Sequence, residues 1–308
     1  MKLSGRAWAV IVLLVVAGGG VWLAVYVRSR MVATSPAGML RRLPPENAMV
    51  LFVDFDTLRR GGVLKLLASS KTEEPDYQSF VRSTGFDYQK DLDLAAASFS
   101  SDGEYFVVKG RFDWQKLRAY AQAQGGSCEN RFCRMQGSTP TRRISFLPLQ
   151  SNLMALAVST DGSAALRLAD ASAGMVQALD PPRDPVWLSI PAESLKAPGQ
   201  LPPGASFFTN ALSSADRILL SVGPEGQQLE ARLLVTCRSS ADAAALAGQL
   251  QHATSLVKEM MAHENQKPDA KDLSGVLTAG IFEQSGRRVL GRWPLPTVFL
   301  ESLTGGTM

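Results

Sequence analysis

The chain has 308 residues, 45% of them hydrophobic, which is ample for a packed core of one large or two small domains and excludes a disordered chain. Its formal net charge of +4 comes from Lys2, Arg6, Arg28 and Arg30, because removing these four from 32 Lys and Arg leaves 28 cations against 28 Asp and Glu. Since a nucleic-acid surface needs an excess of cations, this balance argues against nucleic acid as a partner.

The first predicted element is a membrane-spanning helix over residues 7–27, which together with its basic flanks makes residues 1–30 an anchor. The segment carries no charge, amide or hydroxyl side chain apart from the phenol of Tyr26. As a helix it would be about 32 Å long at roughly 1.5 Å per residue, enough to cross a hydrocarbon core of about 30 Å. Trp8 and Trp22, like Tyr26, lie near its ends, where amphipathic rings favour the headgroup level.

A cleavable signal peptide is the alternative, with Lys2 and Arg6 as its basic region and Ala17 and Gly19 as small residues before the cut. Against it, the apolar run resumes as VWLAVYV and ends in two arginines, as a membrane-spanning helix does. We therefore expect an uncleaved, single-pass anchor in a bacterial inner membrane, with membrane lipid contacting residues 7–27. The distribution of cations on its two sides gives little indication of orientation.

Residues 31–47 contain three prolines and are predicted to be a tether that lifts the folded part off the membrane. The apolar run AMVLFVDFD at residues 48–56 predicts a central strand buried on both faces. A short helix over residues 57–68 follows, and a second helix begins at Pro75 and ends before Gly85. These elements open a first α+β half, residues 48–175.

The clearest hairpin is predicted at residues 94–112, around the turn Ser101-Asp102-Gly103. Asp113 is expected to cap the next helix, which ends at Gly125-Gly126. Three short strands and a helix complete this half, and they are expected near residues 131–136, 143–150, 153–159 and 163–171.

Cys128 and Cys133 lie in SCENRFC, which predicts a tight hairpin with Asn130 and Arg131 as its central residues. In that register the two cysteines face each other in a non-hydrogen-bonded pair, where side chains are closest, so a disulfide fits. By the chain-entropy estimate it would contribute about 2 kcal/mol, and it would persist only in an oxidising compartment. We therefore expect a periplasmic folded part with Cys237 as a buried free thiol; three reduced cysteines in the cytosol are the alternative.

The second α+β half, residues 183–303, repeats the element order of the first. A strand is expected at residues 185–191, a short helix near 205–212, and a hairpin around Gly223-Pro224-Glu225-Gly226. Later elements are a helical turn near 273–278, a strand pair at 281–284 and 287–295, and a last helical turn at 298–303.

The longest helix outside the anchor is expected from Ala241 to about Glu264, with Ser239 as its cap and Asp242 completing a capping box. An apolar stripe at spacings of four and three predicts that one face packs onto a sheet. The stripe consists of Leu246, Leu250, Ala253, Val257 and Met260.

Each half thus reads strand, helix, hairpin, helix, strand, an order that resembles the split βαβ of ferredoxin-like domains. In that arrangement an antiparallel sheet carries helices on one face. The expected fold class is therefore α+β, with an N-terminal transmembrane helix followed by two halves of ferredoxin-like (βαββαβ) order with antiparallel sheets.

Four stretches of the chain are LPPENAMVLFVDFDTLRR, TGFD at residues 84–87, FDWQKL and NQKPDAKDLSGVLTAG. Together they resemble a group of single-pass bacterial membrane proteins that has no established activity. The likeness covers most of residues 43–303, and it implies lineage and architecture rather than function.

Asp54 and Asp56 are the candidate carboxylate site, because from one face of a strand end they could hold a divalent cation together. The structural alternative makes Asp56 the cap of the helix that starts at Thr57 and places Asp54 in a turn or in an ion pair with Arg59 or Arg60.

The rest of the sequence offers little catalytic chemistry. His252 and His263 are eleven residues apart on one helix, roughly 16 Å of rise, so they cannot share one metal ion without another element. The chain contains no G-x-S-x-G turn, no G-x-x-x-x-G-K-[ST] phosphate loop and no G-x-G-x-x-G turn. The sequence therefore predicts no catalytic residue, no cofactor and no metal.

The expected function is that of a non-enzymatic, membrane-anchored extracytoplasmic protein, which binds another protein or supports an assembly. Its expected partner is another envelope protein or a second copy in a homo-oligomer. One alternative is a membrane-tethered hydrolase that works through carboxylates such as Asp54, Asp56 or Asp87. Another is a carrier of an apolar ligand, which would need a large apolar cavity between helices and sheet.

Overall fold

The computed structural model describes residues 34–44, 48–64, 75–170, 181–195, 212, 215–226 and 228–305. The membrane helix expected over residues 7–27 lies outside this part of the chain, as does most of the helix expected near residues 205–212. Within the described ranges, no helix has both the length and the apolar character that crossing a membrane requires.

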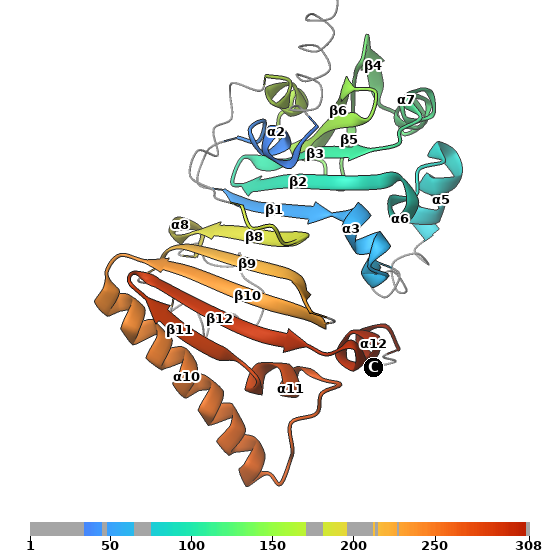
Figure 1. Cartoon of the computed structure of the whole chain (residues 1–308). Coiled ribbons are helices and arrows are strands. Elements are labelled where there is room, and N and C mark those ends of the chain that lie inside the picture. The colour runs from blue at the N-terminus through green and yellow to red at the C-terminus, as the bar shows by residue number, and fades with distance from the viewer. Residues whose placement is uncertain are drawn as a thin grey trace, which may run out of the picture.

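The described strands form a single twelve-stranded sheet in which every neighbouring pair is antiparallel (Figure 1). From one edge to the other the order is β11 (Ile281–Ser285), β12 (Arg288–Leu295), β10 (Gln228–Cys237), β9 (Ala215–Glu225), β8 (Val186–Pro191), β1 (Met49–Asp54), β2 (Leu92–Ser100), β3 (Gly103–Gly110), β7 (Leu153–Ser159), β6 (Arg143–Gln150), β5 (Phe132–Gln136) and β4 (Ser127–Glu129). The molecule is therefore of mixed α+β class, as expected.

Helices border this sheet along its length. They are α2 (Pro36–Leu40), α3 (Phe55–Arg60), α5 (Pro75–Thr84), α6 (Tyr88–Asp91), α7 (Trp114–Ala123), the 3₁₀ helix η1 (Ala164–Leu168), α8 (Ala192–Leu195), α10 (Ser240–His263), α11 (Leu273–Thr278) and α12 (Thr297–Gly305).

The two expected halves join through β1 and β8, so they share one sheet. Phe52 lies opposite Trp187 in this pairing, and the two rings stack with centroids 5.6 Å apart. Trp187 is only 2% exposed. Outward from this seam the strand order is the same on both sides, β1-β2-β3-β7-β6 and β8-β9-β10-β12-β11. The repeat of element order is thus reproduced in the pairing of the strands.

The ferredoxin-like order of the halves is not confirmed. In a split βαβ unit the strands on either side of the first helix run parallel, with another strand between them. Here β1 pairs directly with β2 in the antiparallel sense, with Val53 opposite Ala95. The helices α3, α5 and α6 gather at the end of the sheet where β1 finishes, so the chain turns back beside β1 instead of crossing over (Figure 1).

Opposite faces of the sheet carry different helices. On one face, α2 and η1 pack with inward residues of β3 and β7, among them Tyr105 and Ala155. On the other face, α7 packs near the β4 edge through Leu117 and Ala121, and α10 packs near the β11 edge through residues that include Leu246. The sheet is therefore the middle layer, with the two longest of these helices on the same side.

Most locally determined elements match the prediction. Gly85 follows α5 with φ +72°, and Asp113 caps α7 by accepting hydrogen bonds from two backbone N–H groups. The hairpin of β2 and β3 turns as expected, with Ser100 opposite Gly103. The hairpin of β9 and β10 turns later than expected, because pairing continues to Glu225 and Gln228.

The prediction of a tether over residues 31–47 is wrong for its described part. Met39 and Leu43 are fully buried in the core beneath η1. Arg42 donates through Nη1 to the carbonyl oxygens of Leu168 at 3.1 Å and Ala169 at 2.9 Å, which fastens this segment to η1. Pro36 is the first residue of a short helix, a position that suits proline, and this helix packs into the core.

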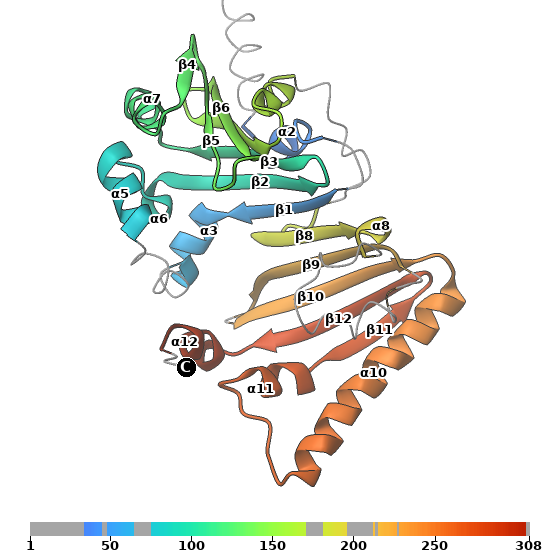
Figure 2. The same cartoon turned by 180° about the vertical axis from the view of Figure 1, so that it is seen from behind.

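α10 is longer than the part of the sheet that it covers. Ser239 caps the helix as expected, its Oγ accepting a hydrogen bond from the Asp242 N–H at 3.0 Å. Leu246 and Leu250 are buried, whereas Met260 is 53% exposed. The C-terminal half of α10 runs past β11, beyond the last strand (Figure 2). The predicted apolar stripe therefore packs on the sheet only in its first half.

An ion cluster around Arg232 ties the segment before β8 to the β9–β10 hairpin. The guanidinium contacts Asp184 Oδ1 at 2.7 Å, Glu225 Oε2 at 2.6 Å and Glu230 Oε1 at 2.8 Å. Gly223 makes room for Asp184, because a Cβ atom at this position would lie 2.1 Å from Asp184 Oδ1. The cluster therefore depends on a residue without a side chain.

Replacing Gly223 tests this arrangement. We expect Gly223→Ala to lower the free energy of unfolding by about 2 kcal/mol, because Asp184 must leave Arg232 to avoid the new methyl group. Gly248→Ala is the matched control: its Cβ meets nothing within 4 Å on α10, so it should raise the free energy of unfolding by about 0.5–1 kcal/mol. Urea denaturation of both variants measures these values; a wild-type stability for Gly223→Ala would contradict the role given to the cluster.

Candidate functional site

Asp54 and Asp56 have separate structural roles. Asp54 ends β1 and caps α3, where Oδ1 accepts from the Thr57 N–H at 2.8 Å and Oδ2 accepts from the Thr57 hydroxyl at 2.9 Å. Asp56 lies in the first turn of α3 and contacts Arg59 at 3.4 Å and Arg60 at 3.0 Å. The cap thus belongs to Asp54 and the ion pairs to Asp56, the reverse of the structural alternative in the sequence analysis. The two carboxylates do not share a strand face.

Asp87, the third carboxylate considered for a hydrolase, caps α6. It accepts hydrogen bonds from the Gln89 N–H and the Tyr77 hydroxyl, both at 3.0 Å, and Lys90 Nζ lies 2.9 Å away. Burial disfavours the Asp87 carboxylate, but the bonds from Lys90, Gln89 and Tyr77 outweigh it and lower the pKa. Burial and the bond to Asp87 raise the pKa of Tyr77 to about 12. Asp87 is therefore ionised and engaged by its neighbours.

The two histidines occupy exposed positions of α10, at His252 and His263. Across the described ranges, no three His, Cys, Asp or Glu side chains gather closely enough to hold a metal ion.

The Cys128–Cys133 disulfide forms in the predicted register. The two residues are paired across β4 and β5, and their sulfur atoms are bonded. Asn130 has φ +54°, the left-handed conformation that tight hairpin turns require. Cys237 is a buried free cysteine, as expected.

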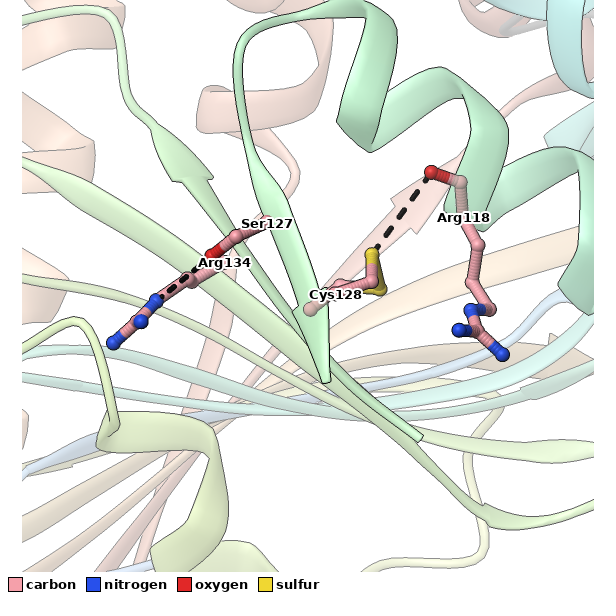
Figure 3. Close-up of a disulfide and its surroundings, with 5 residues drawn as sticks. Arg118, Ser127, Cys128 and Arg134 are labelled. Carbon is pink, nitrogen blue, oxygen red and sulfur yellow. Dashed lines mark hydrogen bonds between the residues drawn. A yellow bond between two sulfur atoms is a disulfide. The ribbon is translucent and has the colours of Figure 1, made fainter. Parts of the chain in front are cut away.

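The disulfide lies against α7. Cys133 is fully buried in the cluster that α7 forms with β5 and β6. Cys128 Sγ lies 3.9 Å from the carbonyl oxygen of Arg118 in α7, and Arg134 Nε donates to Ser127 Oγ at 3.0 Å across the same hairpin (Figure 3). The disulfide therefore links the two strands at the β4 edge of the sheet and packs against α7.

A depression of about 590 Å³ lies where α5 and α6 end and α7 begins. Phe86, Phe112 and Trp114 line it, with ring centroids 5.3 Å apart for the first pair and 5.2 Å for the second. Trp114 Nε1 donates to the Ser151 carbonyl oxygen at 2.9 Å, which fixes the indole. The candidate carboxylates of the sequence analysis, at positions 54, 56 and 87, are not among the lining residues.

Two cations and two carboxylates also line the depression, together with Thr84 and Gly85. Arg111 donates through Nε and Nη2 to Asp91 Oδ1, at 3.1 and 3.0 Å. Asp113 Oδ1 accepts from the N–H groups of Gln115 and Lys116, both at 3.1 Å. The side chains of Arg111 and Lys116 are 67% and 56% exposed. The arrangement can hold a small polar group against aromatic rings.

This depression is not predicted from the sequence, where Gly85 and Asp113 indicate only helix boundaries and no local pattern brings these distant positions together. The available signal was that an aromatic residue adjoins each boundary, Phe86 after Gly85 and Phe112 before Asp113.

A second feature is a group of exposed aliphatic side chains on α10 and α11, which we name the distal surface. It consists of Leu256, Met260, Leu273 and Leu277. Leu273 and Met260 are 62% and 53% exposed. The helix α11 contacts α10, so these side chains lie on neighbouring elements (Figures 1 and 2). Exposed aliphatic groups that gather in this way are typical of interaction surfaces.

Reduction of the disulfide should weaken the fold. We expect reductant to lower the free energy of unfolding by about 2 kcal/mol, because the unfolded chain gains the freedom of an open loop. The Cys128→Ser/Cys133→Ser variant should show no response to reductant. Thiol labelling in denaturant should modify Cys237 alone before reduction and all 3 cysteines after it; three modified thiols without reductant would contradict the bond.

Asp87 makes part of the stability depend on pH. Its pKa in the folded state lies below 3.8, so its contribution is complete above that value and is lost as the pH falls through the lowered pKa. We expect the free energy of unfolding of Asp87→Asn to fall less steeply with acid below about pH 4 than that of the wild type. Urea denaturation across this range measures both slopes, with Asp76→Asn as the control for loss of an exposed carboxylate. Equal slopes for Asp87→Asn and wild type would contradict the expectation.

No family model and no curated protein matches the chain. Among solved structures it is similar to crystal form III of TP0453, with 10% sequence identity and a TM-score of 0.49, over 87% of this chain and 96% of that chain. Crystal form I of TP0453 has 11% identity and a TM-score of 0.44, over 86% of this chain and 96% of that one. Likeness at this distance carries no argument about what the chain does.

Proposed function

We propose that this chain is a non-enzymatic binding module, anchored in a bacterial inner membrane by residues 7–27, whose periplasmic part binds another envelope protein through the distal surface. The observation that carries the proposal is the exposure of large aliphatic side chains on two adjacent helices, α10 and α11. Burial of such side chains is the dominant favourable term in most protein association. A partner that covers them would gain this term.

The part of α10 that extends beyond β11 indicates that the partner is a protein. Beyond the buried Leu250, the apolar stripe continues through Ala253 and Val257, which are only half-buried. A partner that packs on these residues would cover the same face of α10 that the sheet covers in its first half. The helix thus presents an apolar face next to the exposed residues of the distal surface.

The charges near the distal surface also favour a protein over anionic lipid. Anionic lipid attracts an excess of cations. The charged residues of the nearby stretch 258–272 are of both signs, and they are Lys258, Glu259, Glu264, Lys267, Asp269, Lys271 and Asp272. A balanced rim around an apolar centre is typical of protein interfaces.

The proposed location rests on two observations. The apolar segment over residues 7–27 is long enough to span a bilayer, and the amino-acid pattern at its end is that of a membrane-spanning helix. The Cys128–Cys133 disulfide persists in an oxidising compartment such as the periplasm.

The alternative functions have less support. The carboxylates proposed for a hydrolase, Asp54, Asp56 and Asp87, are engaged in helix caps and ion pairs and do not line the depression. A carrier of apolar ligands needs an enclosed apolar cavity, whereas the depression is open and partly lined by charged groups.

Crosslinking of the full-length chain in detergent tests the proposal. We expect a partner to be recovered in stoichiometric amount, and we expect the Leu273→Asn/Leu277→Asn variant to recover at least about tenfold less, because it replaces exposed apolar contacts. Leu166→Asn is the matched control, since Leu166 is 48% exposed but lies on η1. A product that contains only this chain would identify the partner as a second copy.

Two results would contradict the proposal. One is a monomer without partner at native expression. The other is equal recovery of the partner by the wild type and by Leu273→Asn/Leu277→Asn.

A further inference from the structure

We infer that the depression between α5, α6 and α7 is a binding site for a carboxylate carried on an apolar or aromatic body. Such a group could belong to a free aromatic acid or to the C-terminal residue of a polypeptide. The site lies beside the ends of β2 and β3, several strands away from the distal surface, so it does not depend on the proposed protein-binding function.

The hydrogen-bond acceptors of the depression are largely occupied. Asp91 Oδ1 accepts from Arg111, and Asp91 Oδ2 accepts from the Asp87 N–H at 2.9 Å. Asp113 Oδ1 accepts from two N–H groups at the start of α7, and Asp113 Oδ2 lies 3.7 Å from Lys116 Nζ. A ligand that needs acceptors from the protein therefore finds few.

The donors are not all occupied. Arg111 uses Nε and Nη2, and its Nη1 makes no hydrogen bond within the described ranges. The Lys116 ammonium has Asp113 as its ion-pair partner at 3.7 Å, beyond hydrogen-bond length. Two exposed cations thus have hydrogen-bond donors without acceptors, which favours a ligand with acceptor oxygens. A carboxylate supplies two such oxygens.

Gly85 contributes to the position of the Lys116 ammonium. A Cβ atom at Gly85 would lie 3.4 Å from Lys116 Nζ, so the ammonium sits directly over the backbone that ends α5. Its positive charge is favourable beside the carbonyl end of a helix. The ammonium therefore lies beside the depression, on a side chain that is 56% exposed.

The aromatic residues select the body of the ligand. Phe86 and Phe112 stack, and Trp114 adjoins Phe112 at an angle of 46°. All three are half-buried, which leaves part of each ring open to the depression. A volume of about 590 Å³ falls within the range of sites that hold small molecules or one or two side chains.

The balance of charge distinguishes a carboxylate from a phosphate. Arg111 and Lys116 are matched by Asp91 and Asp113, so the formal charges of the lining cancel. A dianion would add two negative charges beside these carboxylates, whereas a carboxylate adds one. We therefore expect inorganic phosphate to bind more weakly than a carboxylate, and it serves as the negative control.

Calorimetric titration of the full-length chain in detergent tests the inference. We expect N-acetyl-L-phenylalaninate to bind at least about tenfold more tightly than its uncharged amide, because only the acid engages the free donors. Lys116→Gln should weaken binding of the acid by about tenfold and leave binding of the amide unchanged. Arg118→Gln is the matched control, because Arg118 is exposed on the same helix but does not line the depression, and it should bind as the wild type does.

A peptide of four alanines and a C-terminal phenylalanine separates the two sources of the carboxylate. Tighter binding than the free acid identifies a polypeptide C-terminus, and equal binding identifies a small acid. Equal affinity for acid and amide, preference for phosphate, or an unchanged affinity in Lys116→Gln would overturn the inference. None of these results would alter recovery of a partner through the distal surface, so the two proposals fail separately.

Discussion

The pairing of β1 with β8 is the interaction on which the architecture depends. It joins two groups of strands into one sheet through a backbone ladder that includes Phe52 and Trp187. Because the strand order is the same outward from this seam, α7 and α10 lie on one face near opposite edges (Figure 1). The depression lies beside the ends of β2 and β3 and the distal surface lies near β11, so several strands separate them and a ligand at one need not touch the other.

Three carboxylates that follow strands or loops begin helices in this chain. Asp54, Asp87 and Asp113 cap α3, α6 and α7 at the ends of strands or loops, where backbone N–H groups would otherwise lack partners. The same bonds hold the carboxylates in fixed positions. Asp54 and Asp87, which the sequence offered as candidate catalytic acids, therefore act as helix caps. The cations of the depression, in contrast, retain N–H donors that no described acceptor uses.

Features that depend on neighbouring residues could be predicted from the sequence, and those that depend on distant residues could not. The Cys128–Cys133 pair and the Asp113 cap follow from spacings of a few residues, so both were found. Burial of Met39 depends on η1, more than 120 residues away, whose contacts no local pattern records. The exchange of roles between Asp54 and Asp56 has a smaller cause: α3 begins two residues earlier than expected.

The single sheet also sets a length. Seven strand spacings separate β3, against which α2 packs, from β11, and at about 4.8 Å each they amount to roughly 34 Å. Each neighbouring pair of strands between them is joined by backbone hydrogen bonds. A partner bound near β11 would therefore sit at a distance from α2 that is set by the number of strands between them, and an ordered sheet lowers the entropic cost of binding there.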